Sequence, residues 1–293
     1  MVSACEIAKR TAPSNEGEIA FFGGSFTAIE REYMLKLLKS AYPFVKEGFF
    51  KGIRISTRPD CIDDEVCAVL KEYGVTSVEL GCQSMSDDVL RKNLRGHTAL
   101  DVENAVNTLR KFGFETGLQM MTGLWGSDYE TDIETAKKII SLKPDTVRIY
   151  PTVVLEDTLL EKKYKSGEYK VMSLDETVEL VAELLRMFEE NGMKVIRTGL
   201  HSGGNVEEGF VAGAYHPAFK ELCESRIYLK KITEQLVNLP EGDIVINVPK
   251  GALSQATGQK KSNREHIESM GFSVRFEEDE SLKKYTVLCR AGK

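Results

Sequence analysis

The sequence predicts a parallel α/β fold, either a (β/α) barrel or an open wound sheet, over residues 1–238. Two observations predict it: apolar β-rich runs alternate with segments of helical period, and six such strand–helix units follow one another. The length of 293 residues, with 42% hydrophobic and 29% charged residues, is enough for one barrel-sized domain and a small appendage.

The predicted strands are short runs rich in β-branched residues, at 18–22, 52–57, 76–80, 114–121, 145–150 and 193–199. The predicted helices lie between or after them, at 63–74, 100–113, 129–141, 175–192 and 216–237. Three of these helices end at Gly74, Gly113 and Gly192, where a left-handed C-terminal cap is expected. Acidic residues in their first turns complement the helix dipole.

The segment 239–243, LPEGD, breaks this rhythm and predicts a second, small α+β domain over 239–293. Its expected elements are a strand at 243–248, a helix at 262–270 and strands at 272–279 and 284–290. Because roughly 50 residues give only a marginal independent core, we expect this domain to lean on the larger one.

Composition narrows the class of protein. No apolar run approaches the ~20 residues that span a bilayer, and the N-terminus lacks a signal-peptide core, so the expected location is the cytoplasm. The net charge of −6 is unevenly placed: residues 241–293 hold nine basic and eight acidic residues, against 30 and 37 in residues 1–240. Residues 249–264 carry four basic residues and no acidic one, which favours a local contact with an anionic partner.

Polar and glycine residues follow the predicted strands, where α/β barrels place their sites. Gly23 and Gly24 end the first strand. The segments at the ends of the next three strands are 56–60, 79–84 and 117–124. A plain tight turn is the alternative for the two glycines. Glu79 ends an apolar strand, so it either finds a buried partner or serves a ligand. His97 is a candidate catalytic residue, although a lone histidine is usually structural. His201 and His216 lack a third ligand, and we predict no metal site from them.

Six ordered segments together resemble the radical SAM proteins related to the catalytic subunit of Elongator, including a bacterial Elongator-like group. They are ISTRPD (55–60), ELGCQSM (79–85), RGHT (95–98), GLQMMTGL (117–124), KPDTVRIYPT (143–152) and HPAFKELCESRIY (216–228). The resemblance implies a partial (β/α) barrel that binds S-adenosylmethionine. It also implies that nine residues contact this cofactor: Gly23, Gly24, Ser25, Glu79, Gln83, Met120, Met121, Arg148 and Tyr150. Among them, the two glycines would receive the methionyl amino group.

A complete member of that family also holds a [4Fe–4S] cluster on a Cys-x-x-x-Cys-x-x-Cys loop. The six cysteines here are scattered, at positions 5, 61, 67, 82, 223 and 289, and form no such run. By the resemblance, the first strand and the cluster loop would precede this chain, and their absence would reflect a truncated gene, a misassigned initiator Met or a deliberate truncation. We therefore expect no cluster and no radical chemistry in this polypeptide. Without that strand, residues 18–23 form an exposed edge, which predicts self-association.

The segment 248–263 resembles the loop of KH-type RNA-binding domains, in which a Gly-x-x-Gly turn between helices clamps the nucleic-acid backbone. Here the turn begins at Gly258, and Lys261 replaces its second glycine. The resemblance predicts an RNA contact of tRNA type through Lys250, Lys260, Lys261 and Arg264. The alternatives are a purely structural appendage, a non-catalytic RNA- or protein-binding module on a barrel scaffold, and an ordinary barrel enzyme with a different ligand.

Overall fold

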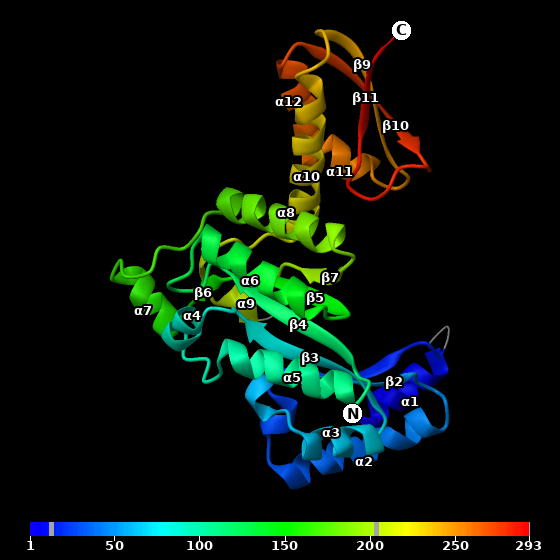
Figure 1. Ribbon diagram of the computed structural model, residues 1–293, viewed down its shortest axis with the longest axis vertical. Coiled ribbons are helices and arrows are strands. Elements are labelled where there is room, and N and C mark those ends of the chain that lie inside the picture. Colours follow the sequence, from blue (N-terminus) through cyan, green and yellow to red (C-terminus); the bar gives the residue numbers. More distant parts are fainter. Residues whose placement is uncertain (12–14, 202–204, 293) are drawn as a thin grey trace. The chain divides into compact units, whose positions relative to one another are not determined.

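The computed structural model in Figure 1 describes residues 1–11, 15–201 and 205–292. The chain divides into two compact units. The first comprises Met1–Tyr150 with Gly192–Arg197, and the second Pro151–Asn191 with Thr198–Lys293. The boundary expected between residues 238 and 239 falls inside the second unit, and an independent domain at 239–293 stays a prediction.

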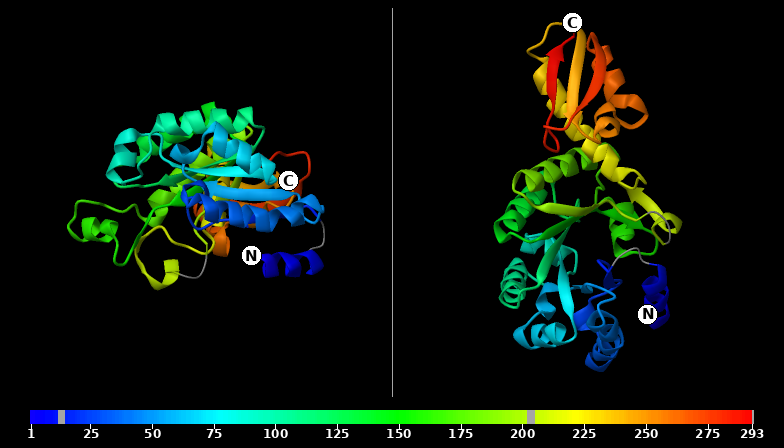
Figure 2. Two further views of the ribbon diagram at one scale, coloured as in Figure 1. Left: turned by 90° about the horizontal axis from the view of Figure 1, so that it is seen from below. Right: turned by 90° about the vertical axis from the view of Figure 1, so that its right-hand side faces the viewer.

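The first unit is built on a six-stranded parallel sheet that curls into a half-barrel, as Figure 2 shows. Its strands are β1 (Glu18–Phe21), β2 (Gly52–Thr57), β3 (Val75–Gln83), β4 (Glu115–Thr122), β5 (Thr146–Pro151) and β7 (Lys194–Thr198), in the order β1-β2-β3-β4-β5-β7. All six predicted strands are present, and the parallel α/β prediction is confirmed. The sheet is open, with β1 at one edge.

The helices of this unit lie before β1 and between the strands, with two of them following β3. They are α1 (Val2–Thr11), α2 (Arg31–Lys46), α3 (Asp64–Glu72), α4 (Asp87–Lys92), α5 (Ala99–Lys111) and α6 (Tyr129–Leu142), with short 3₁₀ turns η1 (Phe26–Ala28) and η2 (Pro59–Cys61). Side chains cap three of them, because Asp63, Thr98 and Asp128 accept backbone N–H groups of the first turn. Helix α2 is not among the predicted helices, and Pro43 interrupts its sequence pattern near the end.

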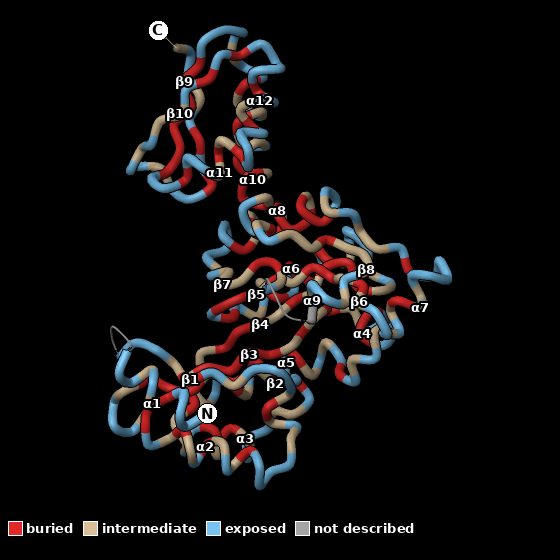
Figure 3. Tube along the Cα trace, turned by 180° about the vertical axis from the view of Figure 1, so that it is seen from behind, coloured by how far each residue is buried: buried red, intermediate tan, exposed pale blue. Residues whose placement is uncertain are grey.

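The core of this unit lies along the central strands. Figure 3 shows buried residues along β3 and β4, where Val78, Leu80, Leu118 and Met120 are fully buried. Helices α3, α5 and α6 pack against these two strands. This rigid centre fixes the strand ends from which the candidate site is built.

The second unit contains α7 (Leu159–Lys165), α8 (Leu174–Glu190), α9 (Asn205–Glu208) and α10 (Phe219–Leu236), with a two-stranded antiparallel pair, β6 (Val153–Leu155) and β8 (Phe210–Gly213). Helix α10 packs on α8. A three-stranded sheet follows: β9 (Gly242–Pro249) lies between β10 (Phe272–Asp279), which is parallel to it, and β11 (Leu288–Ala291), which is antiparallel.

Between β9 and β10 the chain forms α11 (Leu253–Thr257), the 3₁₀ turn η3 (Gln259–Lys261) and α12 (Ser262–Ser269). The last strand is shorter than the predicted 284–290 and begins at Leu288. The reason is Tyr285, which has a left-handed backbone (φ 58°) and is buried, with its hydroxyl donating to Glu224 at 2.9 Å. No helix among the residues described here is long and apolar enough to cross a membrane.

Candidate functional site

A polar pocket of about 410 Å³ is lined by the carboxyl ends of β2 and β3, by the segments that follow β1, β2 and α4, and by a residue of β4. Parallel strands direct their carboxyl ends to one edge of a sheet, which is why segments distant in sequence meet here. The lining residues are Gly24, Ser25, Ser56, Thr57, Arg58, Gly81, Gln83, Leu94, Arg95, His97 and Gln119. The volume is in the usual range for a small-molecule site.

The two glycines after β1 leave open space on the protein surface. A Cβ atom added to Gly23 or Gly24 would meet no other atom within 4 Å. Gly23 also has φ +105°, a backbone region that favours glycine. A ligand can therefore approach the backbone of this turn closely.

Two arginines and no carboxylate belong to the residues that line the pocket. Arg58 is paired with Asp60 outside the lining. Arg95 is half-buried, its Nη2 lies 3.1 Å from the sulfur of Met121, and its buried Nε has no hydrogen-bond partner. Burial lowers the pKa of Arg95, which marks a guanidinium whose charge is not offset. The pocket is thus suited to a ligand that carries an anionic group.

His97 is held by the protein itself. Its Nε2 lies 3.1 Å from the carbonyl oxygen of Cys82, and because a carbonyl only accepts, Nε2 carries the proton. The side chain is only 7% exposed. This geometry gives His97 the structural role of tying the turn after α4 to the end of β3, and its catalytic role stays a prediction.

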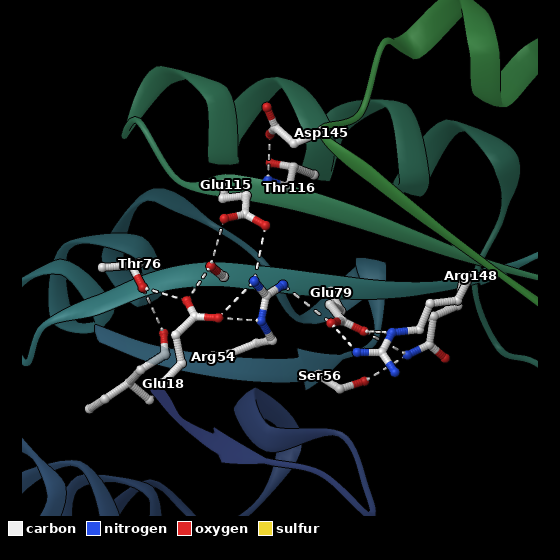
Figure 4. A network of polar contacts seen from close by, with 12 residues as sticks. Glu18, Arg54, Ser56, Thr76, Glu79, Glu115, Thr116, Asp145 and Arg148 are labelled. Carbon is white, nitrogen blue, oxygen red and sulfur yellow. Dashed lines mark hydrogen bonds and ion pairs between the residues drawn. The ribbon is translucent and has the colours of Figure 1, made fainter. Parts of the chain in front are cut away.

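A network of charges occupies the interior of the sheet beside the pocket (Figure 4). Glu79, only 1% exposed, binds Arg148 in a bidentate pair, with Nε to Oε2 at 2.5 Å and Nη2 to Oε1 at 2.6 Å. Gln119 joins the network to the pocket, because its amide lies 3.4 Å from both Glu79 and Ser56. Glu79 has therefore found protein partners.

Arg54 connects three carboxylates of this network, lying 2.8 Å from Glu18, 3.3 Å from Glu79 and 3.0 Å from Glu115. Burial raises the pKa of Glu18, but hydrogen bonds from Ser77 and Arg54 outweigh it and hold the pKa below its usual value. The charges toward the amino ends of β1, β2 and β4 thus satisfy one another. They support the site rather than line it.

The structure brings together only part of the predicted cofactor set. Gly24, Ser25 and Gln83 line the pocket, and Gly23 precedes them. The others lie elsewhere: Glu79 and Arg148 in the charge network, Tyr150 with its hydroxyl 3.3 Å from Arg148, Met120 buried, and Met121 against Arg95. Arg95 and Gln119, which line the pocket, are not in the predicted set, although both lie in the segments 95–98 and 117–124 that carry the resemblance.

The four residues predicted to contact nucleic acid differ in whether other groups of the protein already bind their side chains. Lys260 and Lys261 are exposed and both have left-handed backbones. Lys250 pairs with Glu280 at 2.6 Å, and Arg264 donates to the carbonyl of Val274 at 3.1 Å. Asn263, buried at the start of α12, anchors the turn by donating to the carbonyls of Ser225 and Ala256.

The cysteines are the candidate ligands of an iron–sulfur cluster. All six are free, and four of them are buried: Cys5, Cys67, Cys82 and Cys223. Burial raises the pKa of Cys67 to about 11 and that of Cys82 to about 12, which keeps these thiols protonated at neutral pH. In the part of the chain that the structure describes, no three His, Cys, Asp or Glu side chains gather as metal ligands.

The sequence of this chain matches the models of two known protein families. The radical SAM superfamily matches residues 5–139, and the Radical SAM C-terminal domain matches residues 144–229. The chain belongs to the radical SAM superfamily.

Its relatives within that superfamily are Elongator-type proteins. It is 33% identical over 191 residues to the "tRNA uridine(34) acetyltransferase" of Methanocaldococcus jannaschii, covering 58% of this chain and 35% of the relative. It is 31% identical over 223 residues to "Elongator complex protein 3" of Bos taurus, covering 66% and 41%. The chain thus spans well under half of the length of these relatives.

Among solved structures, an archaeal Elp3 from Methanocaldococcus infernus with an N-terminal deletion (1–46) is similar. The TM-score is 0.66 at 25% identity, over 78% of this chain and 58% of that one. The predicted resemblance to Elongator-like radical SAM proteins is confirmed.

Proposed function

We propose that this chain is an Elongator-like radical SAM protein that binds S-adenosylmethionine in the pocket at the strand ends but does not itself hold the [4Fe–4S] cluster. The observation that carries the first half is the pocket itself, with open glycine backbone on one side and Arg95 without a carboxylate partner among the described residues on the other. Gly24 and Ser25 would face the amino acid end of the ligand, and Arg95 its carboxylate.

The cluster in complete family members supplies the electron that cleaves S-adenosylmethionine. In this chain the six thiols are scattered along the sequence and four of them are buried, which supports the absence of a cluster on these cysteines. We infer that the polypeptide by itself binds the cofactor without cleaving it. The alternative is a non-catalytic RNA- or protein-binding module, for which the pocket would have no role.

The test is binding of S-adenosylmethionine to the purified chain, measured by calorimetry before and after anaerobic incubation with iron and sulfide. We expect saturable binding in both samples and an iron content far below that of a [4Fe–4S] cluster. Arg95→Glu should abolish binding, whereas Arg95→Lys, which keeps the charge, should retain part of it. Cluster-level iron that is lost on mutation of any of the cysteines would contradict the proposal, as would an unaffected Arg95→Glu.

We further propose that the turn Gly258–Lys261 contacts RNA of tRNA type. The support is twofold: two neighbouring exposed lysines, without carboxylate partners among the described residues, stand in a turn between two helices, and curated relatives are named for tRNA. Arg264 and Lys250, which are engaged by the protein, would contribute less than predicted from sequence.

Lys260→Glu with Lys261→Glu is expected to weaken tRNA binding at low salt and to flatten its salt dependence, because each neutralised phosphate releases counterions. Filter binding over a salt series measures both. The matched control is Lys36→Glu with Lys39→Glu, the same charge change on exposed positions of α2. Equal loss in the control would show that only net charge matters, and no tRNA binding by the parent would reject the RNA contact.

Self-association through the edge of the sheet is the remaining proposal. In the described sheet, β1 pairs with β2 and lies at the end of the strand order. We expect dimers or larger species by light scattering at high concentration, with amide protection in β1. Ala20→Lys, at an exposed position of this strand, should suppress them. A parent chain that stays monomeric and unprotected there would refute edge pairing.

A further inference from the structure

Leu94 has a backbone conformation that leucine disfavours. Among the described residues, seven non-glycine residues have positive φ, and two of them, Gln83 (φ 65°) and Leu94 (φ 54°), line the pocket. Left-handed backbone costs a residue with a Cβ of order 1 kcal/mol. Residues held in such backbone conformations cluster at active sites and ligand-binding sites.

The helix end explains the conformation but not the side chain. The N–H of Leu94 donates to the carbonyl of Arg91 and that of Arg95 to the carbonyl of Leu90, which together end α4 in a Schellman motif. Leu94 occupies the position of that motif where glycine is favoured. A leucine there is strained, and it gains nothing by packing, because it is 76% exposed.

The surroundings show what the side chain faces. Leu94 is the one aliphatic side chain among the described residues that line the pocket, and it is next in sequence to Arg95. All of its lining neighbours are glycine, polar or charged. A bound S-adenosyl compound carries a carboxylate at one end and a methylene chain, ribose and purine ring beyond it, which need an apolar contact that the rest of this lining does not offer.

We propose that Leu94 is a ligand-contact residue whose side chain covers the apolar surface of an S-adenosyl ligand. In the free protein the same residue is strained and exposed, which costs stability. The inference rests on the proposed function, since it concerns the same pocket. It assigns to Leu94 a role in affinity, and it predicts that stability and binding change in opposite directions when the leucine is removed.

The experiment compares three variants with the parent chain by thermal unfolding and by calorimetry with S-adenosylmethionine. Leu94→Gly should raise the melting temperature by about 2 °C and weaken binding about five- to tenfold. Lys143→Gly, at the left-handed cap of α6 (φ 50°) and outside the pocket lining, should raise the melting temperature similarly and leave binding unchanged. Leu94→Met, which keeps an apolar side chain, should bind like the parent.

The outcomes separate the two proposals. If the parent binds the ligand and Leu94→Gly binds it as tightly, the role of Leu94 is refuted while the proposed function stands. If Leu94→Gly is both less stable and weaker in binding, Leu94 is a structural residue, and the inference is again refuted. If the parent does not bind at all, the proposed function fails, and the inference fails with it.

Discussion

Replacing Glu79 with alanine is expected to lower the free energy of unfolding by about 3–5 kcal/mol, the usual result of removing one partner from a buried ion pair. Arg148 has no other carboxylate partner among the described residues, and its side chain is only 16% exposed. The variant therefore leaves an uncompensated charge in the sheet interior. Urea unfolding at neutral pH measures the difference.

Two controls identify the cause. Glu115→Ala removes a carboxylate that is 34% exposed, and Arg54 still keeps Glu18, so we expect a loss of about 1 kcal/mol or less. Glu79→Leu combined with Arg148→Met removes both charges and should recover much of the loss, because apolar replacements of a buried pair are often close to neutral. If the double variant is no more stable than Glu79→Ala, lost packing rather than an unpaired charge is the cause.

For Glu79, the sequence predicts that the carboxylate has a partner or a ligand but not which residue that partner is. Its place at the end of an apolar strand already requires a partner or a ligand, but the strand pattern cannot say which. The partners are Arg54 and Arg148, on β2 and β5, and only the order of strands in the sheet reveals that they converge. Long-range pairing of this kind carries no local signal.

The sequence predicts where the site lies, at the carboxyl ends of the strands, but not which residues line it. Periodicity and the glycine pair pointed to the strand ends, and three residues of the predicted cofactor set, Gly24, Ser25 and Gln83, line one pocket there. Arg95 follows the short helix α4 rather than a strand end, so its position depends on how that helix folds back. A cation next to glycine in the segment 95–98 was a signal that reasoning on His97 alone overlooked.

Local rules failed most clearly where a buried contact overrides propensity. Residues 284–287 have strand composition, yet Tyr285 is drawn into a left-handed turn by its contacts with α10. Tyr228 and Tyr285 pack edge to face with ring centroids 5.9 Å apart. The gain from burying two aromatic rings exceeds the difference in strand propensity, which spans about 1 kcal/mol.

Asp132 gives the chain a pH dependence of unusual sign. It lies in α6, is 1% exposed, and accepts hydrogen bonds from the N–H of Gly123 at 2.8 Å and the hydroxyl of Ser127 at 2.6 Å. These bonds hold the loop that follows β4. Burial is nevertheless the dominant influence and raises the pKa of Asp132 from 3.8 to about 6.

The sign of the effect follows from proton binding. Between pH 4 and 6 the folded chain holds a proton on Asp132 that the unfolded chain has released, so stability falls as the pH rises through this window. The resulting loss in the free energy of unfolding is about 3 kcal/mol at most, and it is complete above pH 6. This is opposite to a salt-bridged carboxylate such as Glu18, whose contribution is lost as the pH falls.

Asp132→Asn should therefore be more stable than the parent at pH 7.5, by about 1–3 kcal/mol, and close to it at pH 4.5. The amide can keep both contacts, accepting from Gly123 through its oxygen and donating to Ser127 through its nitrogen. Urea unfolding at both pH values measures the difference between the two chains, in which all other titrating groups cancel. Asp128→Asn, at the exposed N-cap of the same helix, should behave oppositely, because hydrogen bonds from Thr131 hold the pKa of that carboxyl low. Parallel pH profiles for the parent and Asp132→Asn would show that the buried carboxyl is not the source of the effect.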